Sequence, residues 1–104
     1  MSVVKINALE VAPERRDELL RRFAARAGEV SKAEGFEAFE LLAPTDERTT
    51  FLVYTRWRSE EAFEAWREST AFERGHRQHN VEGPAASASE LWSFEVVQRE
   101  EAPH

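Results

Sequence analysis

The chain has 104 residues, enough for one small domain with a single core and too few for a separate cofactor-binding module. Acidic side chains outnumber basic ones by 20 to 14, so no broad positive field is available to hold nucleic acid or an anionic lipid surface. The chain contains no cysteine, which excludes disulfides, thiolate nucleophiles and iron–sulfur sites. No apolar run approaches the roughly 20 residues of a membrane span, and the first residues lack the pattern of a signal peptide. We therefore expect a cytoplasmic protein that binds neither nucleic acid nor membrane.

The first half of the chain predicts a strand, a helix and a hairpin. Residues 3–11 are apolar on both alternating rows, which predicts a strand covered on both faces. Pro13 suits the first turn of a helix, and apolar residues spaced by three and four over 14–34 predict an amphipathic helix that Gly35 ends. Residues 36–43 and 49–58 follow as strands, and the short turn-rich link "PTDER" favours an antiparallel hairpin.

The second half predicts two helical segments and a last strand. Ser59 can cap a helix over 60–68, whose early glutamates suit the positive end of its dipole. Thr70 and Glu73 have the spacing of a capping box, so a new helical segment that carries His76 is expected there. Residues 80–89 form a small, polar linking loop before a strand over 90–98.

The resulting order is strand, helix, strand, strand, helix, strand, with no repeat or linker that would divide it. This order predicts an α+β, ferredoxin-like βαββαβ domain over residues 1–98, with an antiparallel four-stranded sheet, both helices on one face, and a disordered tail at 99–104. Several strands carry large apolar residues on both rows, so the face away from the helices should be covered by a second copy. We expect a homodimer joined sheet to sheet. The pairs on which this expectation rests are Phe36 and Phe39, Phe51 and Leu52, and Leu91 and Trp92.

Two residues on apolar rows are candidates for a site. Asn7 is a polar amide in the row of Val3, Leu9 and Val11, and burying it without a partner would cost roughly 1–3 kcal/mol, so it should form a hydrogen bond. A backbone carbonyl, a water or a bound ligand would each serve. Trp66 has the spacing of an ordinary core residue on its helix, and a role in a site is the alternative.

The segment "TAFERGHRQH" offers a possible ligand-binding face. Phe72, His76 and His79 fall at helical spacings of four and three, and Gly75 leaves room for a flat ligand beside His76. A solvated helix end, where histidine favours the negative end of the dipole, is the alternative. A zinc site built from the two histidines would lack a third ligand at a recognisable spacing.

Arg22 and Arg26 stand four apart on the first helix and flank Phe23. Arginines in such positions commonly form the solvated rim of an amphipathic helix. They would also suit a flat apolar ligand that carries two negative charges.

Taken together, these residues resemble the haem-degrading monooxygenases of the IsdG and MhuD type, within the antibiotic biosynthesis monooxygenase superfamily of dimeric α+β barrels. The resemblance covers nearly the whole chain and is carried in order by "VVKINALEV", "RRFAAR", "EGFEAFELLAP", "EEAFEAW", "GHR" and "FEVV". In that family an Asn on the first strand, a Trp on the second long helix and a His about ten residues further on surround the haem. These correspond to Asn7, Trp66 and His76, with His79 as the alternative ligand.

The resemblance implies that haem b is both cofactor and substrate. His76 would be the axial ligand of the iron, Asn7 would donate its amide N–H toward the oxygen that reacts there, and Trp66 would press on the porphyrin plane. Phe23 and Phe72 would line the pocket, while Arg22 or Arg26 would pair with the propionates. Molecular oxygen and an external electron donor or reductase are implied, because the chain has no flavin or nicotinamide fingerprint.

Two alternatives stay open from the sequence. Other members of the superfamily keep the fold and oxidise small aromatic or polyketide-like substrates without a cofactor. A non-catalytic haem carrier or sensor would bind haem through His76 and leave it intact.

Overall fold

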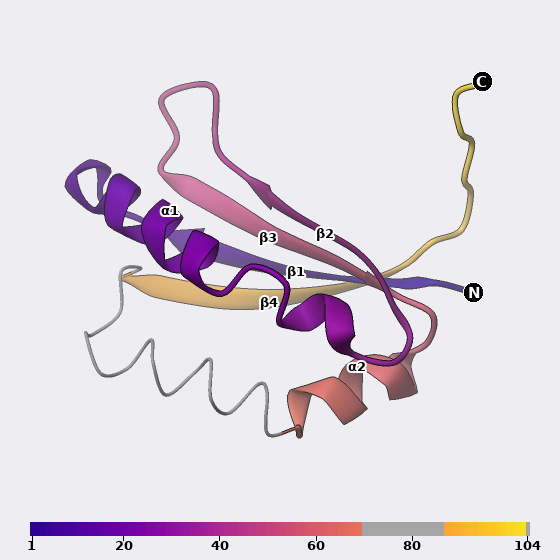
Figure 1. Cartoon of the computed structure of the whole chain (residues 1–104). Helices are drawn as coiled ribbons and strands as arrows, with labels where there is room; N and C mark the ends of the chain where they lie inside the picture. The colour runs from indigo at the N-terminus through magenta and orange to yellow at the C-terminus, as the bar shows by residue number, and fades with distance from the viewer. Residues whose placement is uncertain (70–86, 104) are drawn as a thin grey trace.

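The structure is a computed structural model of the chain, and it describes residues 1–69 and 87–103. Two α-helices and four strands account for most of this part, with two short turns of 3₁₀-helix, η1 and η2, on either side of the first α-helix (Figure 1). This is the ferredoxin-like order expected from the sequence. The elements are β1 (Val3–Glu10), η1 (Pro13–Arg15), α1 (Arg16–Ala25), η2 (Val30–Lys32), β2 (Phe36–Leu42), β3 (Thr50–Trp57), α2 (Glu60–Arg67) and β4 (Ala88–Glu95).

The four strands form one sheet in the order β2-β3-β1-β4, and every neighbouring pair is antiparallel. Because side chains alternate between the faces of a strand, the register assigns each residue to a face. Asn7 lies opposite Val53 on one side and Leu91 on the other. All three belong to the face on which the helices pack.

Helix α1 is shorter than the sequence pattern predicts. It ends at Ala25, and Gly28 follows with a φ of 92°, a left-handed conformation that glycine adopts at little cost. The chain then forms the turn η2 before Gly35, whose φ of 83° leads into β2. The prediction of one helix ended by Gly35 was therefore wrong, because Gly28 already breaks it.

An irregularity in β2 changes which face its aromatic residues occupy. The pairing of β2 with β3 shifts between Phe36 and Ala38, as at a β-bulge. The ring of Phe36 packs edge-on against Trp57, and the ring of Phe39 stacks on Phe23 of α1. Both rings thus lie on the helix-facing side, which corrects the expectation that they occupy opposite rows.

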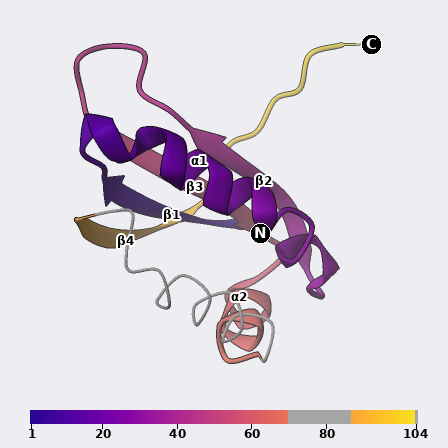
Figure 2. The same ribbon diagram turned by 60° about the vertical axis from the view of Figure 1, so that its left-hand side comes forward.

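Two apolar clusters lie between the helices and the sheet. The first lies under α1 and the second against α2, at the opposite end of the β1–β3 pair. Figure 2 shows the two helices well apart from each other. Ser59 caps α2 as predicted, since its hydroxyl accepts a hydrogen bond of 3.2 Å from the Ala62 N–H. The first cluster consists of Leu9, Val11, Leu19 and Phe51, and the second of Trp57, Ala62 and Phe63.

The sheet face away from the helices keeps large apolar side chains in contact with solvent. Leu42, Trp92 and Phe94 lie there, and Phe94 is 50% exposed. The register places Ile6 between Tyr54 and Trp92 on this same face. We call this surface, made of Ile6, Leu42, Leu52, Tyr54, Trp92 and Phe94, the open face.

Candidate functional site

Asn7, the site residue predicted on the first strand, lies on the helix-facing side of the sheet, between β3 and β4. Across the sheet, one row runs from Leu41 through Val53 and Asn7 to Leu91. Leu41 and Val53 pack against the α1 cluster, whereas Leu91 is 48% exposed. Asn7 is half-buried at the transition between the two halves of this row.

The side-chain amide of Asn7 takes part in no hydrogen bond among residues 1–69 and 87–103. Its strand neighbours Val53 and Leu91 are apolar and offer no side-chain partner. A partly buried amide without a protein partner has unused hydrogen-bonding capacity. Asn7 can therefore bind a polar atom of a ligand on this face.

Trp66 belongs to the aromatic cluster at the α2 end of the sheet. Its ring centroid lies 5.5 Å from that of Trp57 and 6.4 Å from that of Phe63. Trp66 is half-buried, whereas Trp57 beneath it is fully buried. Trp66 thus packs in the aromatic cluster and keeps part of its indole ring exposed.

The two arginines of α1 differ in their surroundings. Arg22 is buried and its Nη2 lies 2.6 Å from Oε1 of Glu18, so it is not part of a solvated rim. Arg26 follows the last turn of α1, with its guanidinium carbon 4.6 Å from the ring centroid of Phe23. Burial, and then the neighbouring charge of Arg22, lower the pKa of the Arg26 guanidinium below its usual value.

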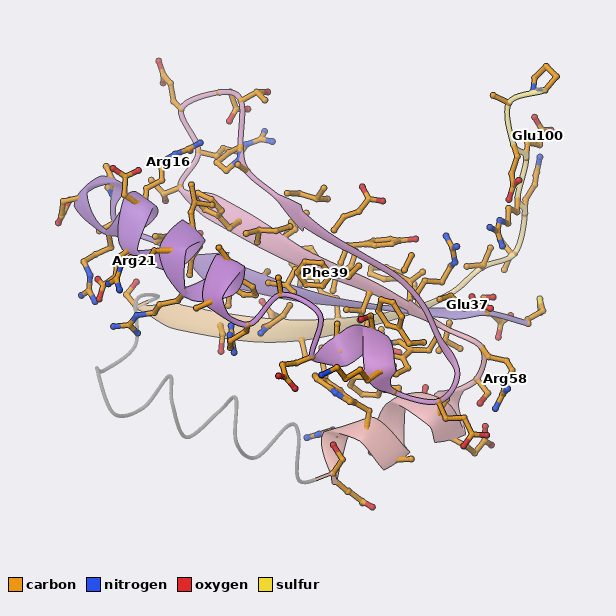
Figure 3. The ribbon with its side chains drawn as sticks, in the orientation of Figure 1. Arg16, Arg21, Glu37, Phe39, Arg58 and Glu100 are labelled. Carbon is orange, nitrogen blue, oxygen red and sulfur yellow. The ribbon has the colours of Figure 1, made fainter. Side chains whose placement is uncertain are left out.

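Arg26 is the better placed of the two to bind an anion. Among the ion pairs of the described residues it has no carboxylate partner, in contrast to Arg22. Phe23 itself is half-buried and stacks on Phe39. Figure 3 labels Phe39 beside the C-terminal end of α1. A cation therefore lies on an aromatic surface at the end of this helix.

The possible ligand-binding face predicted from the sequence lies outside the described residues, since it consists of Phe72, His76 and His79. Most of the predicted loop at 80–89 lies outside them as well. Within residues 1–69 and 87–103, no three or more His, Asp or Glu side chains are grouped so that they could hold a metal ion. No helix in that part of the chain is long and apolar enough to cross a membrane.

The sequence reasoning missed Lys5. This residue is 6% exposed and lies on the same face of β1 as Asn7, two positions away. The signal was present, since a lysine stands in the middle of an otherwise apolar strand. A buried ammonium group needs partners, and the sequence did not reveal which residues would supply them.

The fold and the site can be compared with those of known proteins. Residues 2–78 match the family model described as "Antibiotic biosynthesis monooxygenase". The chain belongs to this family.

Individual relatives narrow the comparison to haem-related proteins within this family. A protein of Mycobacterium tuberculosis named "Heme oxygenase (mycobilin-producing)" is 43% identical over 99 residues, which span 93% of this chain and 90% of the relative. The solved structure of the M. tuberculosis heme-degrader MhuD with two hemes bound in its active site is 41% identical and superposes with a TM-score of 0.83 over 95% of this chain and 99% of that one. A variant of MhuD with two manganese protoporphyrin IX bound per active site gives a TM-score of 0.86 at 39% identity, over 96% and 99% of the two chains.

Proposed function

We propose that this protein is a haem-degrading monooxygenase that binds haem without a covalent bond and opens the porphyrin ring with molecular oxygen and reducing equivalents. The observation that carries this proposal is the 43% identity to a heme oxygenase over nearly the full length of both chains. Haem would supply the iron at which oxygen is activated, and the products would be free iron and an open tetrapyrrole. The chain would supply the axial ligand, the orientation of the ring and a pocket that excludes water.

The protein residues have separate roles in this proposal. A neutral imidazole of His76 would ligate the iron. Asn7 would donate its amide N–H toward the reacting oxygen, which accounts for a polar side chain in an apolar row. Trp66 would press its accessible surface on the porphyrin plane and distort it. Its packing on Trp57 and Phe63 supports this role, because a ring in contact with two other rings resists displacement.

Residues on α1 and just after it would line the haem pocket and bind the haem propionates. Phe23 and Phe72 would line the pocket. Arg26 would pair with a propionate, and the absence of a carboxylate partner among the described residues supports this choice over Arg22. Electrons would come from an external donor or reductase.

We further propose that the protein forms a homodimer through the open face. Exposed Leu42, Trp92 and Phe94 on one side of the sheet support this, since monomers rarely leave such apolar surfaces uncovered. Light scattering after size-exclusion chromatography should give twice the mass of one chain. Trp92→Glu should give the mass of a monomer, while Arg21→Glu, an exposed position on α1, should stay dimeric. A monomeric mass for the unchanged protein would contradict the proposal.

Titration of the purified protein with hemin, followed by ascorbate in the presence of catalase, tests the proposed function. We expect a shifted Soret band that decays after ascorbate is added. A shifted band that persists would identify a haem carrier instead. No shift at all would favour an oxygenase that needs no cofactor.

The axial ligand is tested by replacing each candidate histidine. His76→Ala should abolish the Soret shift, and His79→Ala should preserve it. The reverse result would show that His79 is the ligand.

A further inference from the structure

Lys5 is a buried lysine whose ammonium group contacts residues of two other elements. Its Nζ lies 2.8 Å from Oε1 of Glu60 and 2.6 Å from the hydroxyl of Ser93, and it sits 4.8 Å from the ring centroid of Phe63. Glu60 and Phe63 belong to α2, and Ser93 belongs to β4. One side chain therefore joins three elements.

This arrangement is poorly suited to stability alone. Removing an ammonium group from water carries a penalty that an ion pair offsets only in part, and an apolar side chain of similar size often serves a core as well. Glu60 is half exposed, which weakens its attraction for Lys5 further. What the three contacts do provide is a defined position, because the ion pair with Glu60 and the ring contact with Phe63 hold α2, while the hydrogen bond to Ser93 holds β4.

The helix that Lys5 holds is the one that carries Trp66. The ring of Phe63, over which the ammonium group lies, packs against Trp66 at a centroid distance of 6.4 Å. Lys5 also stands two positions from Asn7 on the same face of β1. The contacts thus connect the strand that carries Asn7 with the helix that carries Trp66.

We propose that Lys5 is a positioning residue that sets the place of Trp66 relative to Asn7 by anchoring α2 to β1 and β4 through Glu60, Phe63 and Ser93. Lys5 acts through these neighbours. Its consequence for haem turnover rests on the proposed function, whereas its effect on the place of Trp66 does not.

Fluorine NMR of the ligand-free protein labelled with fluorotryptophan tests the positioning directly. The chain has three tryptophans, so the resonance of Trp66 can be assigned with Trp66→Phe. Lys5→Met, which keeps an unbranched side chain one heavy atom shorter and removes the charge, should shift or broaden the Trp66 resonance. Lys32→Met, at an exposed position in η2, should leave all three resonances unchanged. An unchanged Trp66 resonance in folded Lys5→Met would overturn the proposal.

A second variant covers the case in which Lys5→Met does not fold. Glu60→Gln removes the carboxylate at a half-exposed position and leaves the core intact. It should move the Trp66 resonance in the same way by a smaller amount. No movement in Glu60→Gln would then overturn the proposal.

Haem turnover distinguishes positioning from mere support of the fold. We expect Lys5→Met to lower kcat by about tenfold, as a small misplacement of a group at the reacting centre does, with KM for haem within about twofold of the original. A raised KM with unchanged kcat would overturn the positioning role. If the unchanged protein does not degrade haem at all, the proposed function fails, while the fluorine spectra still decide whether Lys5 positions Trp66.

Discussion

The two ends of the layer between the helices and the sheet are built from different side chains. Under α1 the core is aliphatic apart from phenylalanine, with Leu9, Val11 and Leu19 packed around Phe51. Against α2 the core consists of aromatic rings in edge-on and tilted contacts, with Trp57 in contact with Phe63 and Trp66, and a buried ammonium group beside them.

The difference has a functional meaning. Aliphatic packing stabilises a helix without requiring one particular side chain, because a core tolerates other apolar side chains of similar total volume. Edge and face contacts between rings, combined with an ion pair, favour one orientation. The α2 end is therefore suited to hold Trp66 at a set angle, while the α1 end supplies most of the aliphatic core.

Trp57→Ala should have the largest effect on stability. Trp57 is fully buried and touches Phe36, Phe63 and Trp66, so the free energy of unfolding should fall by about 4 kcal/mol. Urea denaturation measures this loss. A decrease below about 1 kcal/mol would show that the aromatic cluster does not support the fold.

Leu19→Ala should affect stability without affecting the aromatic cluster. Leu19 is 1% exposed in the α1 core, and its truncation should cost about 3 kcal/mol. The near-ultraviolet circular dichroism of the tryptophans should stay unchanged, whereas Trp57→Ala should alter it. Equal changes in both spectra would mean that the two ends are not independent.

A smaller effect is expected from Glu18 on α1, and it depends on pH. Hydrogen bonding from Arg15, aided by the charges of Arg15 and Arg22, lowers the pKa of Glu18 below its ordinary value of 4.5. A carboxyl whose pKa is lower in the folded state contributes stability above its unfolded pKa and loses that contribution as the pH falls through the folded pKa.

Glu18→Gln should therefore be less stable than the unchanged protein above pH 4.5, and the gap should close at lower pH. Thermal melting across this range measures the gap, with Asp17→Asn on the exposed side of the same helix as the control. A gap that persists in acid would show that the ion pairs of Glu18 are not its cause.

The smallest effect on stability is expected from Asn7→Leu. Asn7 is half-buried between Val53 and Leu91, and a leucine there should change the free energy of unfolding by no more than about 1 kcal/mol. Haem degradation should nevertheless be lost, because the amide N–H is removed. A destabilisation as large as that of Leu19→Ala would instead make Asn7 a structural residue.

Much of the fold could be predicted from local sequence. The apolar run of β1, the cap at Ser59 and the order of elements each depend on neighbours within a few residues, and each was found in the structure. The end of α1 was missed because Gly28 and Gly35 both carry the same stop signal, and only the backbone reveals that each adopts a positive φ.

The remaining features depend on contacts between residues distant in sequence. The bulge after Phe36 depends on how β2 pairs with β3, and no spacing within β2 indicates it. The partners of Lys5 come from 55 and 88 residues away. Asn7 was recognisable as a candidate because it is a polar exception on its strand, whereas Trp66 has ordinary core spacing and became a candidate through the family resemblance. The pairing of Arg22 with Glu18 is a local contact, four residues apart on α1, that the spacing could have indicated.

The release of iron from hemin-loaded protein tests the central claim most directly. After ascorbate is added in the presence of catalase, a ferrous chelator should detect free iron rising as the Soret band disappears, in the unchanged protein and not in Asn7→Leu. A Soret band that persists with no chelatable iron, in protein shown to bind hemin, would contradict the assignment of haem degradation.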